Sequence, residues 1–319
     1  MSIGVGLWLW SDYQRFLHTP LAVPAGGVVY EIRPGTTLRA LVRDLKRQGL
    51  LRQPLYFRLY ARLSGQAARL RAGEYRIAPG VTPVGLMELF SSGRTLQARL
   101  TVPEGWTYRQ MLQAVQSHPK IRVVIGQDQD VMALLGEPGM HPEGWFFPDT
   151  YYFPKGTTDL EFLRRAHREM KRRLEEAWRS RQPGLPLKSA YEALILASIL
   201  EKETSRRAEY PLIAAVFVRR LQRDMKLQTD PTVIYGLGER FDGNLRRRDL
   251  REDTPYNTYV RSGLPPTPIC LPGADALRAA TRPADVPYLY FVSKGDGTHH
   301  FSKSYSEHVK AVRKYQLKR

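Results

Sequence analysis

The sequence predicts an α+β protein, with a small α+β module near the N-terminus and a larger, mainly helical part after it. Three features indicate this class: a recurring strand–turn–helix unit, long helical segments between residues 160 and 223, and a hairpin pattern near the C-terminus. With 42% hydrophobic and 25% charged residues the chain can build a core, which excludes global disorder. Its 319 residues indicate about two domains.

The strand–turn–helix unit occurs three times, each time with a glycine turn and a threonine that can cap the following helix. Its turns are Pro34-Gly35, Pro79-Gly80 and Glu104-Gly105. The first unit has a strand at 28–33, two helices ending near 49 and 64, and a strand at 73–77. This outline is similar to that of a LysM-type glycan-binding module. We therefore expect an arm over 1–27, a module over 28–100 and a second domain over 101–319.

The N-terminal arm begins with an apolar segment from Ile3 to Trp10. It is too short to span a bilayer and lacks the basic start of a signal peptide. Two interpretations stay open. Trp8 and Trp10, followed by Arg15, are typical of the end of a transmembrane helix whose beginning is missing. Alternatively, the segment is a loose arm.

The chain is strongly basic, with 49 Lys and Arg against 31 Asp and Glu and a net charge of +18. This excess predicts a polyanionic partner, either nucleic acid, a membrane surface or an anionic polymer. The single cysteine, Cys270, excludes a disulfide framework and a cysteine-based zinc cluster. His299 and His300 would face opposite sides of a strand, so they cannot share a metal. We therefore expect no metal or cofactor.

The second domain is predicted to contain a basic helix over 160–178, a helix from about 189 to 203 that is apolar nearly all round, and a helix over 211–223. A hairpin is expected over 288–301. Between Trp145 and Phe153, six of nine residues are aromatic. These rings either cover the core or form a platform on which sugars or bases stack.

Two carboxylates, Glu201 and Glu203, lie at the end of the apolar helix. Burial raises the pKa of a carboxyl group, and a protonated acid near neutral pH is what cleavage of an ether-like bond requires. Helical periodicity places both on buried sides and does not choose between them. The alternative is a structural ion pair with Lys202 or with the arginines that follow.

Two later segments offer further polar groups. Asp230 precedes Pro231, which predicts that Asp230 caps a helix whose first residue is the proline. A second carboxylate for a hydrolase would have to come from Asp224 or Asp230. The segment 256–259 offers aromatic surfaces and an amide that could hold polar rings, although an ordinary turn would also explain it.

Several ordered motifs resemble the MltG (YceG-like) family of bacterial endolytic peptidoglycan transglycosylases. They are EGWFFPDT (143–150), ASILEKET (197–204), LQTDPTVIYG (227–236), YNTY (256–259), GLPP (263–266), PGA (272–274) and YLYFV (288–292). The resemblance covers essentially the whole chain from about residue 28. It implies a LysM-like N-terminal part, a lysozyme-like catalytic part and a single inner-membrane anchor with the catalytic domain in the periplasm.

The resemblance also implies cleavage of nascent glycan strands, with peptidoglycan polymerases as further partners and without nucleic acid. Other lytic transglycosylases carry Gln-Glu-Ser on a helix, which places the catalytic acid on Glu203, with Thr204 in the place of the serine and Glu201 as the fallback. The resemblance also implies supporting roles from motif position. One group lines the cleft: Gln228, Thr229 and Asp230. The other group holds the sugar: Tyr256, Asn257 and Tyr259.

The mechanism that the resemblance implies needs one carboxylate, because the 6-hydroxyl of N-acetylmuramic acid attacks the anomeric carbon. The same Glu serves as acid and then as base, and the product carries a 1,6-anhydro ring. Two rival functions remain. One is a non-catalytic peptidoglycan-binding scaffold of the wall-synthesis machinery. The other is a nucleic-acid binder, which predicts binding that weakens steeply with salt.

Overall fold

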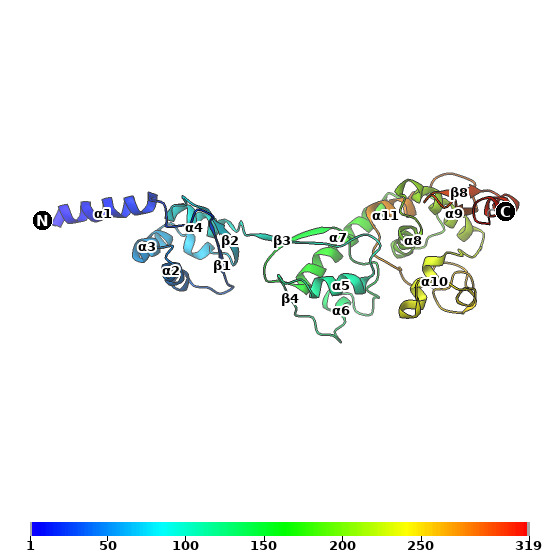
Figure 1. Cartoon of the computed structure of the whole chain (residues 1–319), viewed down its shortest axis with the longest axis horizontal. Coiled ribbons are helices and arrows are strands. Elements are labelled where there is room, and N and C mark those ends of the chain that lie inside the picture. The colour runs from blue at the N-terminus through cyan, green and yellow to red at the C-terminus, as the bar shows by residue number, and fades with distance from the viewer. Residues whose placement is uncertain (1, 318–319) are drawn as a thin grey trace. The chain divides into compact units, whose positions relative to one another are not determined.

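The computed structural model of the chain describes residues 2–317 and divides into two compact units (Figure 1). The first unit is Met1–Arg99 with Tyr152–Thr157, and the second is Leu100–Tyr151 with Thr158–Arg319. Helices are combined with four two-stranded sheets among the described residues, which confirms the predicted α+β class. Similarity of the first unit to LysM modules and the expected boundaries at 27 and 100 stay predictions.

The first unit packs helices around one antiparallel strand pair. It contains α1 (Ser2–His18), β1 (Val28–Ile32), α2 (Leu38–Arg47), α3 (Pro54–Leu63), a 3-10 turn (Gln66–Arg69), β2 (Gly73–Ile77) and α4 (Pro83–Ser92). Tyr30 pairs with Tyr75 across the two strands. Phe57 and Phe90 are fully buried beside them, so this unit has a core of its own. Thr37 caps α2 by accepting from the backbone N–H of Ala40.

The N-terminal segment is helical and its second half packs on the module. Tyr13 and Leu17 are 7% and 6% exposed, whereas Trp8 and Trp10 are 66% and 61% exposed. The arm is therefore not loose over its second half. Within the described residues, none of the helices combines the length and the apolarity that crossing a membrane requires.

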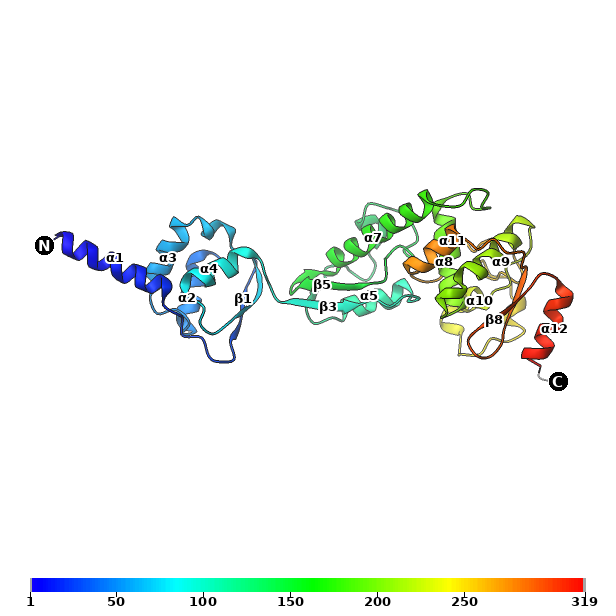
Figure 2. The ribbon, with the colours of Figure 1, turned by 90° about the horizontal axis from the view of Figure 1, so that it is seen from above.

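In the second unit, other helices pack around a central helix, α8 (Figure 2). Its helices are α5 (Tyr108–Gln116), α6 (Val131–Leu134), α7 (Asp159–Arg179), α8 (Ala190–Glu203), α9 (Tyr210–Gln222), α10 (Asp230–Leu237), α11 (Ala274–Thr281) and α12 (Tyr305–Tyr315), with 3-10 turns at Arg207–Glu209, Gly238–Arg240 and Asp249–Arg251. The remaining strand pairs are β3 (Gln97–Thr101) with β5 (Thr150–Pro154), β4 (Ile121–Arg122) with β6 (Thr157–Thr158), and β7 (Tyr290–Ser293) with β8 (His299–Ser302).

Helix α8 is buried as its composition predicts. Its residues from Ala193 to Leu200 are at most 3% exposed, and the helix contacts α7, α9, α10 and α11. Ser189 caps its start by accepting from the N–H of Glu192 at 3.3 Å. Ser198 Oγ accepts from the N–H of Ile269 at 3.0 Å, which ties the helix to the loop before α11. The far end of α8, with its glutamates, is thus held in a fixed position.

The aromatic segment from Trp145 to Phe153 belongs mainly to the core. Phe146 and Phe153 are fully buried and Trp145 is 8% exposed, whereas Tyr152 is 56% exposed. Because most of these rings pack inside, the segment is no open stacking platform.

Candidate active site

Glu203 is the last residue of α8, and its carboxylate is held by a hydroxyl group. Thr229 Oγ1 donates to Glu203 Oε2 at 2.5 Å. Burial raises the pKa of Glu203, the nearby charge of Asp230 raises it further, and the hydrogen bond from Thr229 with the charges of His299 and Arg220 lowers it in part. The net direction is upward, so a larger fraction of this group is protonated at neutral pH than of an exposed glutamate.

Thr229 is itself fixed by other buried threonines. It is 2% exposed, and its N–H donates to Thr258 Oγ1 at 3.1 Å. Thr232 Oγ1 donates to the carbonyl of Thr229 at 2.8 Å and lies 2.9 Å from Thr258 Oγ1. Just before Thr229, Gln228 is exposed and adopts a φ of 52°, which is uncommon for a residue with a side chain. The hydroxyl of Thr229 is therefore aimed at Glu203 by the surrounding fold.

The start of α10 differs from the prediction by one residue. Thr229, not Asp230, is the N-cap residue, and Asp230 is the first residue of the helix. The backbone of Thr229 is extended, as an N-cap requires, but its hydroxyl serves Glu203 instead of the helix. Asp230 accepts a hydrogen bond from the Tyr259 hydroxyl at 2.6 Å. The prediction was wrong because the helical backbone already includes Asp230, which places Pro231 one residue further into the first turn.

The segment from Tyr256 to Tyr259 has mixed roles. The side chain of Asn257, which is 1% exposed, donates to the carbonyls of Asp249 and Glu252 at 3.1 and 2.7 Å, so it supports the turn from within. Tyr256 donates to or accepts from Thr267 Oγ1 at 2.9 Å. A direct contact of Tyr256, Asn257 or Tyr259 with a sugar stays a prediction, and the internal bonds of Asn257 do not favour it for that residue.

Glu201 has both carboxylate oxygens occupied by partners within the protein. Tyr210 donates its hydroxyl to Oε1 at 3.0 Å, and the N–H of Gly273 donates to Oε2 at 2.9 Å. Burial raises the pKa of Glu201. Because these bonds join α8 to α9 and to the start of α11, Glu201 acts as a structural link. The geometry therefore favours Glu203 as the acid.

Two adjoining grooves run along the end of α8. The first, which we call the Glu203 groove, has a volume of about 660 Å³ and is lined by Glu201, Glu203, Thr204 and Tyr210, among others. The second, the Glu143 groove, has a volume of about 1240 Å³ and contains Glu143. Gln110 and Lys202 line both, so the two grooves meet there. Together they form an extended concave surface next to Glu203.

Glu143 is a buried carboxyl group that the sequence analysis did not select. It is 4% exposed. The N–H of Tyr108 donates to its Oε1 at 2.8 Å, and Tyr235 donates its hydroxyl to Oε2 at 3.0 Å. Glu143 thereby joins the start of α5 to α10, the helix that begins beside Thr229. Burial raises the pKa of Glu143 to about 7. The only indication of its burial in the sequence was its position two residues before the aromatic segment that begins at Trp145.

Replacing Glu143 by glutamine should remove a pH dependence of stability. The native state binds the Glu143 proton more tightly than the unfolded state, so its stabilising contribution is complete below about pH 4.5 and is lost as the pH rises through about 7. Between pH 5 and pH 8, the free energy of unfolding of the wild type should fall by about 2–3 kcal/mol more than that of Glu143→Gln. Urea unfolding measures this difference.

The matched control is Glu239→Gln, which replaces an exposed carboxylate on the same groove. It should keep the pH dependence of the wild type. Equal pH dependence of the wild type and Glu143→Gln would show that Glu143 is ionised in the native state throughout this range.

Two further groups near the site, Arg220 and His299, make contacts that were not predicted. Arg220 is 7% exposed and donates to the carbonyls of Leu289 and Leu227 at 2.8 and 2.9 Å, which ties the β7 hairpin to the segment before Thr229. His299 Nδ1 lies 2.7 Å from Glu209 Oε2. Sequence spacing could not reveal the contact of Arg220 with Leu289 or that of His299 with Glu209, because these partners are 69 and 90 residues apart.

No group of three or more potential metal ligands occurs within residues that the structure describes. The expectation that the chain needs no metal or cofactor stays a prediction.

Comparison with known proteins identifies relatives of the whole chain. The sequence model of the YceG-like family matches residues 30–314. A curated relative from Bacillus subtilis (strain 168), named endolytic murein transglycosylase, is 32% identical over 89% of this chain and 83% of its own length. A relative of the same name from Streptococcus pneumoniae (strain D39) is 26% identical, and the match covers 94% of this chain but 61% of that protein.

A solved structure has a similar fold. The 2.6 Å crystal structure of a YceG-like protein from Listeria monocytogenes aligns with a TM-score of 0.56 and 28% identity, over 89% of this chain and 98% of that one. The family match spans nearly the whole chain and includes both grooves and both glutamates at the end of α8. The chain therefore belongs to the YceG-like family.

Proposed function

We propose that this protein is a peptidoglycan lytic transglycosylase in which Glu203 is the catalytic residue. The observation that carries the proposal is a carboxyl group with a raised pKa, held by Thr229 and placed in a groove at the end of a buried helix. The curated relatives named endolytic murein transglycosylase support the substrate. The bond cleaved is the β-1,4 bond between N-acetylmuramic acid and N-acetylglucosamine.

The first step transfers the Glu203 proton to the glycosidic oxygen. The bond from that oxygen to the anomeric carbon breaks, and the N-acetylglucosamine fragment leaves with a free 4-hydroxyl. Burial favours this step because it raises the pKa of Glu203, so a larger fraction of the acid carries the proton than in an exposed glutamate. The resulting Glu203 carboxylate accepts a hydrogen bond from Thr229, which limits the cost of its charge in a partly buried site.

In the second step, the same carboxylate accepts the proton of the muramyl 6-hydroxyl. The 6-oxygen bonds to the anomeric carbon, which closes a 1,6-anhydro ring and restores the protonated Glu203. No water is consumed, so no second carboxylate is needed to activate one. Asp230 then has a supporting role: it is held by Tyr259, and its charge raises the pKa of Glu203.

The substrate of this reaction is a glycan strand that lies across the end of α8. The Glu203 and Glu143 grooves meet at Gln110 and Lys202, which gives a strand room on both sides of the cleaved bond. Cleavage within a strand, rather than at its end, fits this arrangement and would limit strand length. We further propose action on nascent strands on the periplasmic side of the inner membrane, with a membrane anchor and peptidoglycan polymerases as partners.

Analysis of the products tests the reaction. Purified glycan strands digested with the wild type should yield shorter internal fragments that end in 1,6-anhydro-muramyl residues, as read by mass spectrometry. Reducing ends would contradict the proposal and would indicate a hydrolase, whose second carboxylate would have to be Asp224 or Asp230. Binding without cleavage would instead indicate the non-catalytic scaffold.

Removal of the Thr229 hydroxyl should slow the reaction and shift its pH profile. We expect Thr229→Val to lower kcat by about 10- to 100-fold, because the ionised Glu203 loses its charge-assisted hydrogen bond. The same loss raises the pKa of Glu203, so the decline of activity at high pH should move upward. Thr229→Ser keeps the hydroxyl and is the matched control. An unshifted profile in Thr229→Val would show that this bond does not tune the acid.

A further inference from the structure

The first unit exposes a leucine face on α3. Leu55, Leu59 and Leu63 are 72%, 46% and 72% exposed. Their spacing of four residues places them along one side of the helix. The opposite side, with Phe57 and Ala61, is buried in the core of the unit. These three exposed leucines form an apolar patch that no other part of this unit covers.

Helix α1 is a second element of this unit with exposed apolar side chains. Trp8 and Trp10 are 66% and 61% exposed, and more than half of the exposed large apolar side chains among the described residues lie on α1 and α3. The two helices are in contact: the rings of Tyr13 and Tyr56 lie 5.5 Å apart, and Tyr56 donates its hydroxyl to Asp12 at 3.0 Å. Figure 2 shows the beginning of α1 projecting from the module that contains α3.

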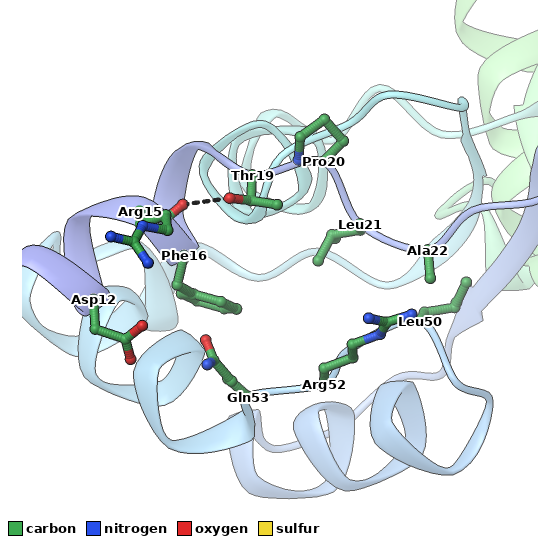
Figure 3. Close-up of a pocket in the computed structure, with 10 residues that line it drawn as sticks. All are labelled: Asp12, Arg15, Phe16, Thr19, Pro20, Leu21, Ala22, Leu50, Arg52 and Gln53. Atoms are coloured by element: carbon green, nitrogen blue, oxygen red, sulfur yellow. Dashed lines mark hydrogen bonds between the residues drawn. The ribbon is translucent and has the colours of Figure 1, made fainter.

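Cationic groups lie on α3 and between α1 and α3. Arg58 and Arg62 lie on α3 three residues after Leu55 and Leu59, which places them beside the leucines. A pocket of about 340 Å³ between the end of α1 and the start of α3 is lined by Arg15 and Arg52 (Figure 3). Figure 3 shows these two side chains at opposite ends of the pocket.

The two arginines that line this pocket are available to bind a ligand. Neither Arg15 nor Arg52 forms an ion pair with a carboxylate in the described part of the chain, although Asp12 also lines the pocket. Asp12 is engaged by the Tyr56 hydroxyl. Exposed leucines, interfacial tryptophans and unpaired arginines are the combination by which a helix binds the surface of an anionic bilayer.

We propose that this face, formed by the α3 leucines, the start of α1 and the four arginines, rests on the surface of a bilayer that contains anionic lipids. The leucines enter the boundary between headgroups and acyl chains, and the arginines pair with lipid phosphates. This contact adds to any anchoring by α1. It does not rest on the proposed enzymatic activity, because it concerns the first unit and is measured by binding.

Vesicle sedimentation of the full chain tests the proposal. The test variant is Leu55→Ser, Leu59→Ser and Leu63→Ser combined. The matched control replaces three exposed apolar residues of the second unit, Val123→Ser, Val124→Ser and Leu134→Ser. Partition onto vesicles of phosphatidylcholine with phosphatidylglycerol should weaken by about tenfold or more in the test variant and stay unchanged in the control. Circular dichroism and thermal unfolding confirm that both variants fold.

Three outcomes would overturn the proposal. The first is wild-type partition of the α3 variant while Trp8→Ser with Trp10→Ser abolishes it, which would assign all binding to α1. The second is equal partition onto vesicles of phosphatidylcholine alone, which would remove the role of the arginines. The third is a dimer in sedimentation velocity that the α3 variant dissociates without change in vesicle binding, which would make a second copy the occupant.

Discussion

Replacing Glu203 by glutamine is expected to lower kcat for glycan cleavage by about a hundredfold to ten-thousandfold. The amide cannot supply a proton to the glycosidic oxygen, and it cannot take one from the 6-hydroxyl, so both steps lose their catalyst. Binding should persist, because the two grooves keep their shape. The measurement is the initial rate of fragment release from purified strands, with strand binding measured in parallel.

The fold should survive this change. Glutamine keeps an oxygen that can accept from Thr229 and removes a charge that burial disfavours, so the free energy of unfolding should not fall. Glu201→Gln is the matched control, two residues away on the same helix. It should weaken the links to Tyr210 and Gly273 and lower stability by about 1–3 kcal/mol, with kcat changed less than about tenfold. Full activity of Glu203→Gln with loss of activity in Glu201→Gln would move the acid to Glu201.

Replacing Gly144 by alanine should destabilise the second unit by about 2–5 kcal/mol. Gly144 adopts a φ of +83°, and a Cβ there would lie 2.6 Å from the Cβ and Cγ of Pro268 and 3.5 Å from Leu194. A proline ring cannot rotate away as a long side chain can. The turn that carries Glu143 would therefore have to move or strain, and thermal or urea unfolding would register the loss.

Gly139→Ala separates the two causes. Gly139 has a similar φ of +79°, but nothing lies within 4 Å of its Cβ position. It should therefore show only the backbone strain, about 1–2 kcal/mol. Equal losses in the two variants would show that Pro268 yields and that close packing at Gly144 contributes nothing.

The sequence predicted those parts of the site that depend on local pattern. The run of apolar residues before Glu203 predicted a buried helix, and its residues from Ala193 to Leu200 are buried. The position of Glu203 came from a motif, since periodicity alone could not separate it from Glu201. The strands of the β7–β8 hairpin were also recognisable, because they are short, adjacent and joined by a glycine turn.

The contacts that join distant segments could not be predicted in this way. The carboxylate of Glu143 accepts hydrogen bonds from Tyr108 and Tyr235, which lie 35 and 92 residues away in the sequence. The pairing of β3 with β5 joins strands separated by three other elements, α5, β4 and α6. Asp230 was expected as the N-cap because the pattern Asp-Pro favours it locally, but Thr229 is the N-cap residue, and its hydroxyl bonds to Glu203 on another helix.

The central claim is that one carboxylate cleaves the strand without water, and digestion in water enriched in the heavy isotope of oxygen tests it most directly. The wild type should produce new muramyl ends that are lighter than hydrolysed ends by one water and that carry no heavy oxygen. Glu203→Gln should produce new ends at least about a hundredfold more slowly. Heavy oxygen at the new ends formed by the wild type would contradict the account, because it would show that water, activated by a second group, attacks the anomeric carbon.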